Sequence, residues 1–262
     1  MKITLLGVGG SAGSPQIGGP DGFGDWGDLD QAEPRNRRTR ASIVIETPEN
    51  KRLLVDTGPH LRVQLTAQGI GRIDAVLYTH AHADHIAGLD EIRILNRILG
   101  APLPTYASAA TWAELRQRFD YAFKPLTGGF FIRPALQAHE ITPQQPIDIL
   151  GLKMCLIDQD HGFSRSLGLR IGSFAYCTDV VRLDAQAMAA LAGVRVLVVD
   201  CFTRAGAHPT HAHLAQVLEW VAHLRPHRTV LTHMGPDMDY QTLLKTLPPG
   251  VEPGYDGMVM LA

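Results

Sequence analysis

The sequence predicts an α/β fold in which two packed sheets are flanked on the outside by helices. Two groups of short strand patterns occur along the chain, and segments with helical spacing of apolar residues follow each group. No linker or low-complexity stretch separates the two groups. We therefore expect the 262 residues to form a single domain.

The first group of strands lies in the N-terminal third of the chain. Apolar runs predict strands over residues 2–6, 42–46, 52–55 and 75–78. Apolar residues with the period of a helix predict helices over residues 59–68, 87–99 and 109–119. These elements would form one sheet and the helices that cover it.

The second half of the chain begins with strands and continues with both kinds of element. The strand patterns cover residues 130–136, 153–157, 167–171 and 174–177. After them come a helix over 185–191, a strongly apolar strand over 194–199, a helix over 212–224, a strand over 229–231 and a helix over 240–247. This half would form the second sheet with its own outer helices.

A long loop at about residues 9–40 interrupts the regular pattern. Nine glycines lie between Gly7 and Gly27, and acidic residues and then arginines follow. Loops of this length in compact domains are usually functional. The arginines could contact an anionic substrate or could pair with the acidic residues of the same loop, and the sequence leaves both readings open for Arg35, Arg37, Arg38 and Arg40.

The start of this loop has some features of a dinucleotide-binding fingerprint. A predicted strand precedes the glycines of Gly7 to Ala12, and Ala12 can replace the third glycine of such a motif. However, Gly13-Ser14-Pro15 follows where the helix of a fingerprint should begin. We therefore favour a tight loop near the functional site.

Composition excludes several classes of protein. The net charge of -2 and the pI of about 6.6 provide no basic field that could hold a long nucleic acid. The N-terminal apolar run is too short for a secretory signal and no segment reaches membrane-spanning length, so we expect a cytoplasmic protein that does not bind membranes. Three cysteines without paired spacing, Cys155, Cys177 and Cys201, fit a reducing compartment.

The segment His80-Ala81-His82-Ala83-Asp84-His85 predicts a metal site. In an extended loop, side chains two residues apart point the same way, so His80 and His82 can present two imidazoles to one ion. Asp84 and His85 stand where the next helix should begin, and they need not face the same ion. Four such ligands within six residues indicate two metal ions rather than a solvated histidine cluster, whose groups would repel one another when protonated.

With Thr79 before it, this segment resembles the signature of the metallo-β-lactamase superfamily. Further segments are similar to its branch of phosphoribosyl cyclic phosphate phosphodiesterases, namely Leu6-Gly7-Val8-Gly9-Gly10-Ser11, Asn36-Arg37-Arg38-Thr39-Arg40-Ala41-Ser42, Val55-Asp56-Thr57-Gly58 and Tyr255-Asp256-Gly257-Met258. The resemblance implies a four-layer αβ/βα sandwich, with two metal ions at the edge between the sheets and hydrolysis of an ester as the activity.

The resemblance also implies a complete set of metal ligands. The first ion would take His80, His82 and His161, and the second would take Asp84, His85 and His233. Asp179 would bridge the two ions. The donors are all nitrogen or oxygen, which suits Mn²⁺ or Zn²⁺ and also Fe²⁺.

His211 is the residue outside the ligand set to which we assign a catalytic role, together with Asp84. It stands at the predicted start of the helix that follows the strand over 194–199, where backbone amides and an imidazole suit an anion. The resemblance implies that a histidine at this place acts on the scissile phosphate, as general acid or as a clamp on an oxygen. Asp56 is expected to hold a ligand imidazole without touching a metal.

The remaining histidines are expected to have ordinary roles. We assign a solvated or capping role to His208 and His213, and surface positions to His60, His139, His223 and His227. The chain also departs from the resembling branch, since many of its members carry a cysteine-rich zinc site in the early loop and no cysteine precedes Cys155 here.

The most favoured function is therefore hydrolysis of a small cyclic or nucleotide-like phosphodiester by two divalent metal ions. The main alternative is hydrolysis of a thioester, lactone or other carboxyl ester at the same centre. Transfer RNA processing is disfavoured because the chain lacks a basic excess, and a non-enzymatic metal sensor is disfavoured because no ligand is missing. The expected partner is a small anionic phosphodiester rather than a long nucleic acid, and a homodimer stays open.

Overall fold

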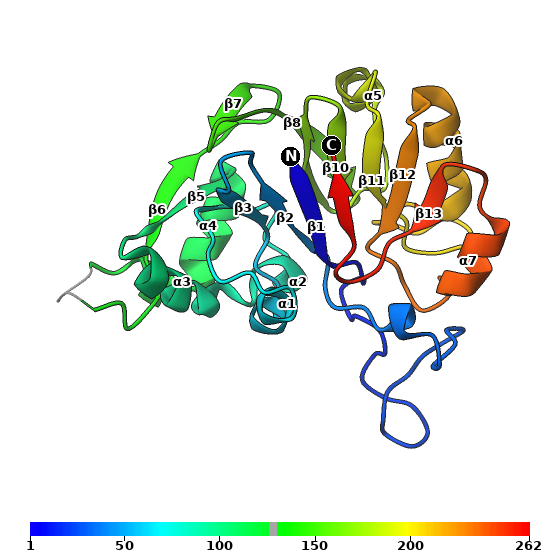
Figure 1. Ribbon diagram of the computed structural model, residues 1–262, viewed down its shortest axis with the longest axis horizontal. Helices are drawn as coiled ribbons and strands as arrows, with labels where there is room; N and C mark the ends of the chain where they lie inside the picture. Colours follow the sequence, from blue (N-terminus) through cyan, green and yellow to red (C-terminus); the bar gives the residue numbers. More distant parts are fainter. Residues whose placement is uncertain (126–129) are drawn as a thin grey trace.

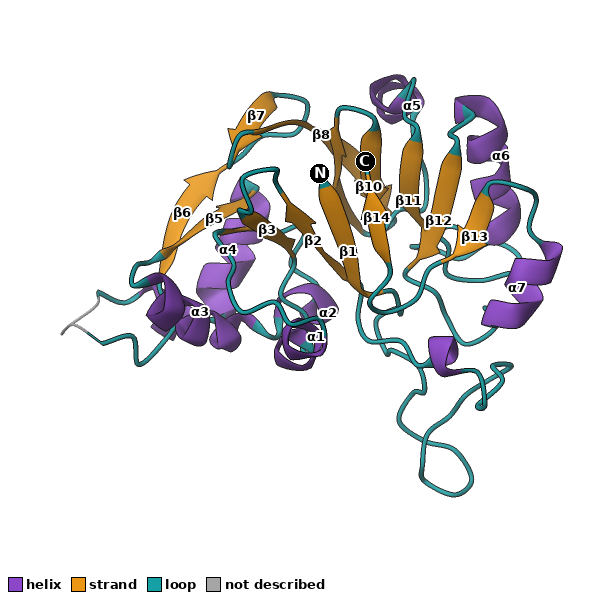
Figure 2. Ribbon diagram, viewed as in Figure 1, coloured by secondary structure: helices purple, strands orange, loops and turns teal. Residues whose placement is uncertain are grey.

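The computed structural model describes residues 1–125 and 130–262. Two seven-stranded sheets pack against each other, and helices cover their outer faces, as Figures 1 and 2 show. The predicted αβ/βα sandwich is confirmed. Among the described residues, none of the helices has the length and apolar content that crossing a bilayer requires.

The first sheet has the strand order β14-β1-β2-β3-β4-β5-β6. Its strands are β1 (Lys2–Gly7), β2 (Ser42–Glu46), β3 (Arg52–Val55), β4 (Ala75–Leu77), β5 (Leu103–Ala107), β6 (Leu136–Glu140) and β14 (Val259–Leu261). Pairing is antiparallel from β14 to β3 and parallel from β3 to β6. The helices of this half are α1 (Leu61–Ala67), α2 (Ala83–Ile86), α3 (Ile92–Leu99) and α4 (Ala109–Arg118), with 3-10 turns η1 (Pro34–Asn36), η2 (Leu89–Glu91) and η3 (Asp120–Phe123).

The second sheet has the order β13-β12-β11-β10-β9-β8-β7. Its strands are β7 (Pro146–Ile149), β8 (Leu152–His161), β9 (Ser164–Ile171), β10 (Phe174–Cys177), β11 (Val196–Asp200), β12 (Arg228–Thr232) and β13 (Val251–Pro253). Pairing is antiparallel from β7 to β10 and parallel from β10 to β13. Its outer helices are α5 (Ala185–Leu191), α6 (Leu214–Leu224) and α7 (Tyr240–Thr246).

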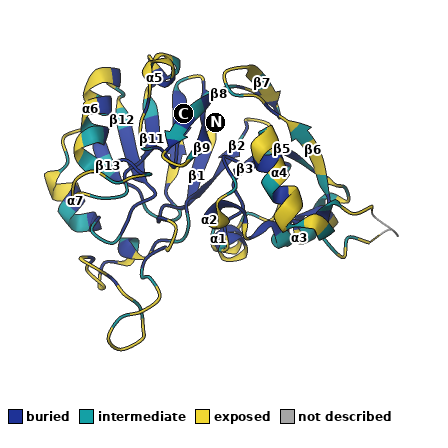
Figure 3. Cartoon of the chain, turned by 180° about the vertical axis from the view of Figure 1, so that it is seen from behind, coloured by how far each residue is buried: buried dark blue, intermediate teal, exposed yellow. Residues whose placement is uncertain are grey.

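The alternation of side chains along β3 explains how one sheet serves two cores. Leu53 and Val55 belong to the core between the sheets, together with Leu169 of the second sheet. Leu54 points to the other face and packs in the cluster that includes Leu61 of α1. Successive side chains of a strand face opposite sides, so an uninterrupted apolar strand is buried on both. Figure 3 shows this burial, with buried strands inside and partly exposed helices outside.

One predicted strand is wrong. Residues 130–136 were expected to form a strand, but β6 begins only at Leu136. Phe130 and Ile132 are exposed, and Arg97 of α3 lies over the ring of Phe130 at 4.3 Å and donates a hydrogen bond to the carbonyl of Phe131. Pro134 provides no amide for a ladder, so this stretch approaches the sheet as a loop.

The loop at 9–40 is irregular apart from η1 and extends away from the sheets at the bottom of Figure 1. Of the two readings that the sequence left open for its arginines, pairing within the loop holds for Arg35, and Arg38 follows neither reading. Arg35 pairs with Glu33 at 2.6 Å, whereas Arg38 is buried and donates to the Asn36 side chain and to the Met238 carbonyl. Asn36 in turn donates to Asp239 at 2.7 Å. Hydrogen bonds to the segment before α7 therefore order a loop that contains no cysteine.

Candidate metal centre

The structure brings all seven predicted ligands together at the edge between the two sheets. His80 and His82 follow β4, and Asp84 and His85 lie in the short helix α2. The other three stand at the ends of strands of the second sheet: His161 is the last residue of β8, Asp179 follows β10 and His233 follows β12. Strand β8 was predicted to end at residue 157, and it continues instead through His161.

The seven residues form two groups that share one carboxylate. We call His80, His82, His161 and Asp179 the first ligand group, and Asp84, His85, Asp179 and His233 the second ligand group. Within each group the ligand atoms lie within 4.8 Å of one another. The His85 Nε2 atom is 3.1 Å from Oδ1 of Asp179, and the His80 Nε2 atom is 3.7 Å from Oδ2. This arrangement is compatible with a dinuclear site for divalent metals.

Each of three ligand imidazoles is oriented through its other ring nitrogen. The Nδ1 atom of His85 is 2.7 Å from Asp56, that of His161 is 2.7 Å from the Thr210 carbonyl, and that of His80 is 2.9 Å from the Thr79 hydroxyl. A proton on Nδ1 leaves the lone pair of Nε2 free for a metal. Asp56 therefore lies where we expected it, behind a ligand imidazole.

The burial of the free nitrogens fits a metal. The Nε2 atom of His80 is buried and has no hydrogen-bond partner within residues 1–125 and 130–262, whereas the buried Nε2 of His85 faces the Asp179 carboxylate. A buried polar nitrogen without a partner is costly, and coordination of an ion removes that cost. The donor set of imidazoles and carboxylates also suits divalent zinc, manganese or iron.

The two groups differ in the protonation of their imidazoles. Burial lowers the pKa of all three imidazoles of the first ligand group, so these are neutral and ready to coordinate. Burial acts the same way on His85 and His233, but the charge of Asp179 and its neighbours outweighs it. The pKa of His85 is raised well above its usual range and that of His233 to about 9. Metal binding to the second group therefore releases protons.

Three residues of the centre have left-handed backbone conformations. Asp56, Asp179 and His233 have φ angles of 66°, 53° and 54°, which side chains other than glycine rarely adopt. Such strain persists where the surroundings fix it, and it often marks functional sites. Each residue follows a strand, so the sharp turn of the backbone aims its side chain across the sheet edge.

His211 lies beside the second ligand group. Its ring stacks on that of His233 with 4.5 Å between centroids, and its Nδ1 atom is 2.7 Å from Oδ2 of Asp200. Asp200 is fully buried at the end of β11. His211 was expected to open a helix, but α6 begins only at Leu214, so the imidazole is presented by the preceding loop. The free backbone amides at the start of α6, which were expected to lie beside His211 and face an anion, therefore belong to residues after it.

Asp200 is a functional candidate that the sequence reasoning missed. Its signal was visible, because it closes an apolar strand in the same way as Asp56 does. The other histidines lie largely as expected: His213 takes the N-cap position of α6 without a side-chain capping bond, and His223 and His227 are exposed. His60 and His139 differ, because both are partly buried, His60 beside Arg40 and His139 stacked on the ring of Tyr106.

A cavity of about 350 Å³ opens beside the first ligand group. Its wall includes His80 and His82 on one side and side chains of α4 and β9 on the other, among them Ser108, Arg118 and Arg165. Both arginines are paired, Arg118 with Glu114 and Arg165 with Asp158, each at 2.7 Å. The cavity is therefore a small, nearly neutral space directly next to the candidate metal site.

Comparison with known proteins decides the family. A family model described as the β-lactamase superfamily domain matches residues 51–234, which include all seven candidate ligands. The chain belongs to the β-lactamase superfamily. Its two sheets and outer helices have the arrangement of the metallo-β-lactamase fold.

Two solved structures and one curated protein illustrate the similarity. A diphosphatase from the PhnP family has 32% sequence identity and a TM-score of 0.88, over 100% of this chain and 97% of its own. This similarity confirms the predicted phosphoribosyl cyclic phosphate phosphodiesterase-like branch. Zn²⁺-bound PqqB from Methylobacterium extorquens has 18% identity and a TM-score of 0.76 over the whole of both chains, and shows the fold alone. An octanoyltransferase from Porphyromonas gingivalis is 32% identical over 98% of this chain, which spans only 51% of that protein's length.

Proposed function

We propose that this superfamily member is a two-metal phosphodiesterase that acts on a small cyclic or nucleotide-like phosphodiester. The observation that carries the proposal is the His211–Asp200 pair beside the second ligand group. The similarity to a diphosphatase over nearly the full length of both chains supports a phosphate substrate. The preferred ion is Mn²⁺ or Zn²⁺, with Fe²⁺ as a further candidate.

In this proposal, His80, His82 and His161 hold one ion, Asp84, His85 and His233 hold the other, and Asp179 serves both. When bound, two divalent ions polarise phosphoryl oxygens and lower the pKa of water. The ring nitrogens that face Asp56, Thr210 and Thr79 keep the ligand imidazoles in the required orientation.

The chain's own residues would manage the protons of the reaction. Water adds to phosphorus, the bond from phosphorus to the leaving oxygen breaks, and a phosphomonoester and an alcohol result. The proton that the water loses passes to solvent, which also reprotonates His211 after each turnover. Asp84 lies 3.4 Å from His233 and 3.3 Å from His85, and these imidazoles outweigh the effect of burial and hold its pKa well below the usual range, so the carboxylate would stay ionised and orient the attacking water. His211 gives the proton of Nε2 to the leaving oxygen, while Asp200 accepts a hydrogen bond from Nδ1 and stabilises the imidazolium.

The leaving group explains why His211 favours a phosphodiester over a thioester. An alkoxide is a strong base and leaves poorly without a proton, whereas a thiolate, with a pKa near 8.5 for a cysteine, leaves unaided. A held proton donor is therefore more useful for an oxygen leaving group. The cavity beside His80 and His82 would receive one of the two groups attached to the phosphate, and its volume of about 350 Å³ limits that group to a small one.

A second candidate is hydrolysis of a thioester or carboxyl ester at the same centre. The observation in its favour is the octanoyltransferase relative, whose name denotes acyl chemistry. Since this chain matches about half of that protein, the named activity need not belong to the matched half.

A hydrolysis panel on metal-loaded protein separates the candidates. It compares a cyclic phosphodiester, a phosphomonoester, an acyl thioester, a lactone and a precursor transfer RNA at equal enzyme concentration. We expect the phosphodiester to have the highest kcat/KM. A higher kcat/KM for the thioester or for the lactone would replace the proposal by acyl-ester hydrolysis, and a higher value for the RNA would replace it by RNA processing.

A further inference from the structure

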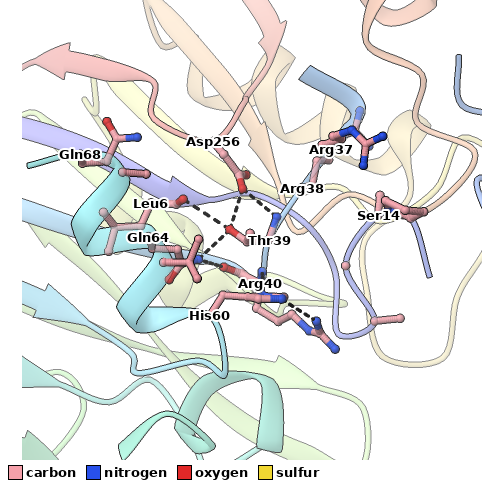
Figure 4. A pocket seen from close by; sticks show the side chains of 15 residues that line it. Leu6, Ser14, Arg37, Arg38, Thr39, Arg40, His60, Gln64, Gln68 and Asp256 are labelled. Carbon is pink, nitrogen blue, oxygen red and sulfur yellow. Dashed lines mark hydrogen bonds between the residues drawn. The ribbon is translucent and has the colours of Figure 1, made fainter. Parts of the chain in front are cut away.

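A second cavity lies outside the candidate metal centre, between the glycine-rich loop and α1. Its volume is about 390 Å³, and Figure 4 shows the side chains around it. The loop contributes residues 12–15, the arginine segment contributes residues 37–40, and α1 contributes Val63, Gln64 and Ala67. None of the seven candidate ligands lines it.

Three arginines, Arg37, Arg38 and Arg40, line this cavity, and none of them takes part in any ion pair that the described part of the chain forms. Neutral groups hold two of them. The terminal nitrogens of Arg38 donate to the loop and to the segment before α7, and Arg37 lies over the ring of Trp26 at 4.7 Å. Arg40 instead donates to the Ser11 carbonyl at 2.9 Å and lies beside the His60 ring at 3.3 Å (Figure 4). Arg35, two residues before this run, shows the contrast, because it has Glu33 as a partner.

The single carboxylate of the wall does not neutralise these guanidinium groups. Asp256 is turned toward the backbone, where it accepts hydrogen bonds from the amide and hydroxyl of Thr39 and from the amide of Val8. Asp256 forms no ion pair with the described residues. The cavity wall therefore carries more positive than negative charge, and a guanidinium without a carboxylate partner is suited to a phosphate.

Buried hydrogen-bonding atoms also lack partners in the wall. The hydroxyl of Ser14, Nε of Arg38 and Oε1 of Gln64 are buried, and none forms a hydrogen bond with residues 1–125 or 130–262. These three side chains are 7%, 2% and 3% exposed. Polar atoms this deeply buried normally have a partner, so three of them around one cavity indicate a ligand with polar groups.

We propose that this cavity binds a small organic phosphate at a site separate from the metal centre. The phosphate would lie against Arg40 and the Ser14 hydroxyl, with Nε of Arg38 as a further donor. The organic part would pack on the apolar wall of Val63 and Ala67 of α1. A volume of about 390 Å³ is in the usual range for a small-molecule site.

The cavity lies close to the candidate metal centre. Gly58 lies between them, because a Cβ atom placed on it would be 3.3 Å from Cβ of Arg40 and 2.4 Å from the carbonyl oxygen of Asp84. On the other side, a Cβ atom on Gly10 of the glycine-rich loop would be 3.6 Å from the ring of His233. The segment around Gly58 thus lies between the cavity wall and Asp84, and the glycine-rich loop that forms part of the wall also lies beside His233.

Calorimetric titration of the full-length, metal-loaded protein tests the site. The probes are inorganic phosphate and phenylphosphonate, which carries an apolar ring on a bond that water does not hydrolyse. We expect two binding events per chain, one at the metals and one in the cavity. Variants with a disrupted metal centre should keep the cavity event. In those variants, phenylphosphonate should bind more tightly than phosphate.

Arg40→Gln should weaken one of the two events at least about tenfold, the loss expected for a charge-assisted hydrogen bond, and leave the other unchanged. Arg62→Gln is the matched control. Arg62 is an exposed arginine of α1, the helix that forms part of the cavity wall, but it does not line the cavity. It should retain both events. A single binding event, or equal weakening by the two substitutions, would overturn the proposal.

Ser14→Ala separates binding from folding. The Ser14 hydroxyl makes no hydrogen bond to the described residues, so its removal should leave the melting temperature unchanged or slightly raised. The affinity of the cavity event should nevertheless fall several-fold. Unchanged affinity in a folded Ser14→Ala protein would also contradict the proposed site.

Discussion

The Nδ1 atom of His211 lies 2.7 Å from Oδ2 of Asp200, and this contact turns the other ring nitrogen of His211 away from the carboxylate. Asp200 is fully buried at the end of a central strand, so its position is fixed by the sheet. The ring of His211 also stacks on His233 of the second ligand group. In the proposed mechanism, His211 is thereby held next to the candidate metal centre as the proton donor, by a residue that does not touch the substrate.

Asp200→Asn should therefore damage turnover without loss of metal. The amide removes the negative charge beside the protonated imidazole, and we expect kcat to fall roughly tenfold or more. Initial rates on an alkyl phosphodiester and metal analysis of both proteins provide the measurement. An unaltered kcat with two metal equivalents would reduce Asp200 to a purely structural residue.

Asp179→Ala should lower the occupancy of both metal sites together. Asp179 is the one residue common to the two ligand groups, within 3.1 to 3.7 Å of the imidazoles of His85 and His80. Metal analysis should give close to two equivalents per chain for the original protein. Loss of a single equivalent in the variant would show that Asp179 serves only one ion.

Asp56→Asn should weaken only the second site. Asparagine tolerates the left-handed backbone at this position, so the turn should persist, but it no longer accepts the His85 proton in the same way. We expect about a 10- to 100-fold loss of affinity for one of two equivalents, the usual effect of such outer partners. Asp74→Asn, a carboxylate that caps β3 through the amide of Arg52, is the control and should leave both affinities intact.

Glu33 should give the loop at 9–40 an acid-sensitive contribution to stability. Hydrogen bonds and the ion pair with Arg35 outweigh the effect of burial and hold the pKa of Glu33 at about 2, below its unfolded value of 4.5. A lowered pKa stabilises the fold above pH 4.5, and that contribution is lost as the pH falls toward 2.

Melting temperatures measured at roughly pH 6 to 2.5 would check this contribution, because the range covers most of the interval between the unfolded and folded pKa of Glu33. The decline toward acid should be shallower in Glu33→Gln than in the original protein. Glu49→Gln, at an exposed turn position, is the matched control and should follow the original curve. Parallel curves for all three proteins would remove the assigned role of Glu33.

How much of the centre could be predicted depends on how local its signals are. The segment from His80 to His85 lies on one strand exit and one short helix, so its spacing alone indicates metal ligands. His161 and His233 converge with it only through the packing of two sheets, and without the family resemblance each would look like a surface histidine. Asp200 was missed because its partner His211 is eleven residues away in a loop.

The fold was predicted where strands are apolar and missed where they are short or interrupted. Strands β2, β3 and β10 have the predicted bounds, because each is buried over nearly its full length. Strand β5 contains Pro104, and β13 is only three residues long, so neither gives a clear alternation of apolar and polar residues. Strand β7 is largely exposed at the sheet edge and gives no apolar signal.

The most direct test of the account compares His211→Ala with the original protein on two phosphodiesters, one with an alkyl and one with a nitrophenyl leaving group. Since His211 lies beside the ligands without being assigned as one, the variant should keep two metal equivalents and its melting temperature. Its rate on the alkyl ester should fall by roughly a hundredfold to ten-thousandfold, and much less on the nitrophenyl ester, whose leaving group needs no proton. Loss of metal, or the same proportional loss on both esters, would contradict the role of His211 as the proton donor.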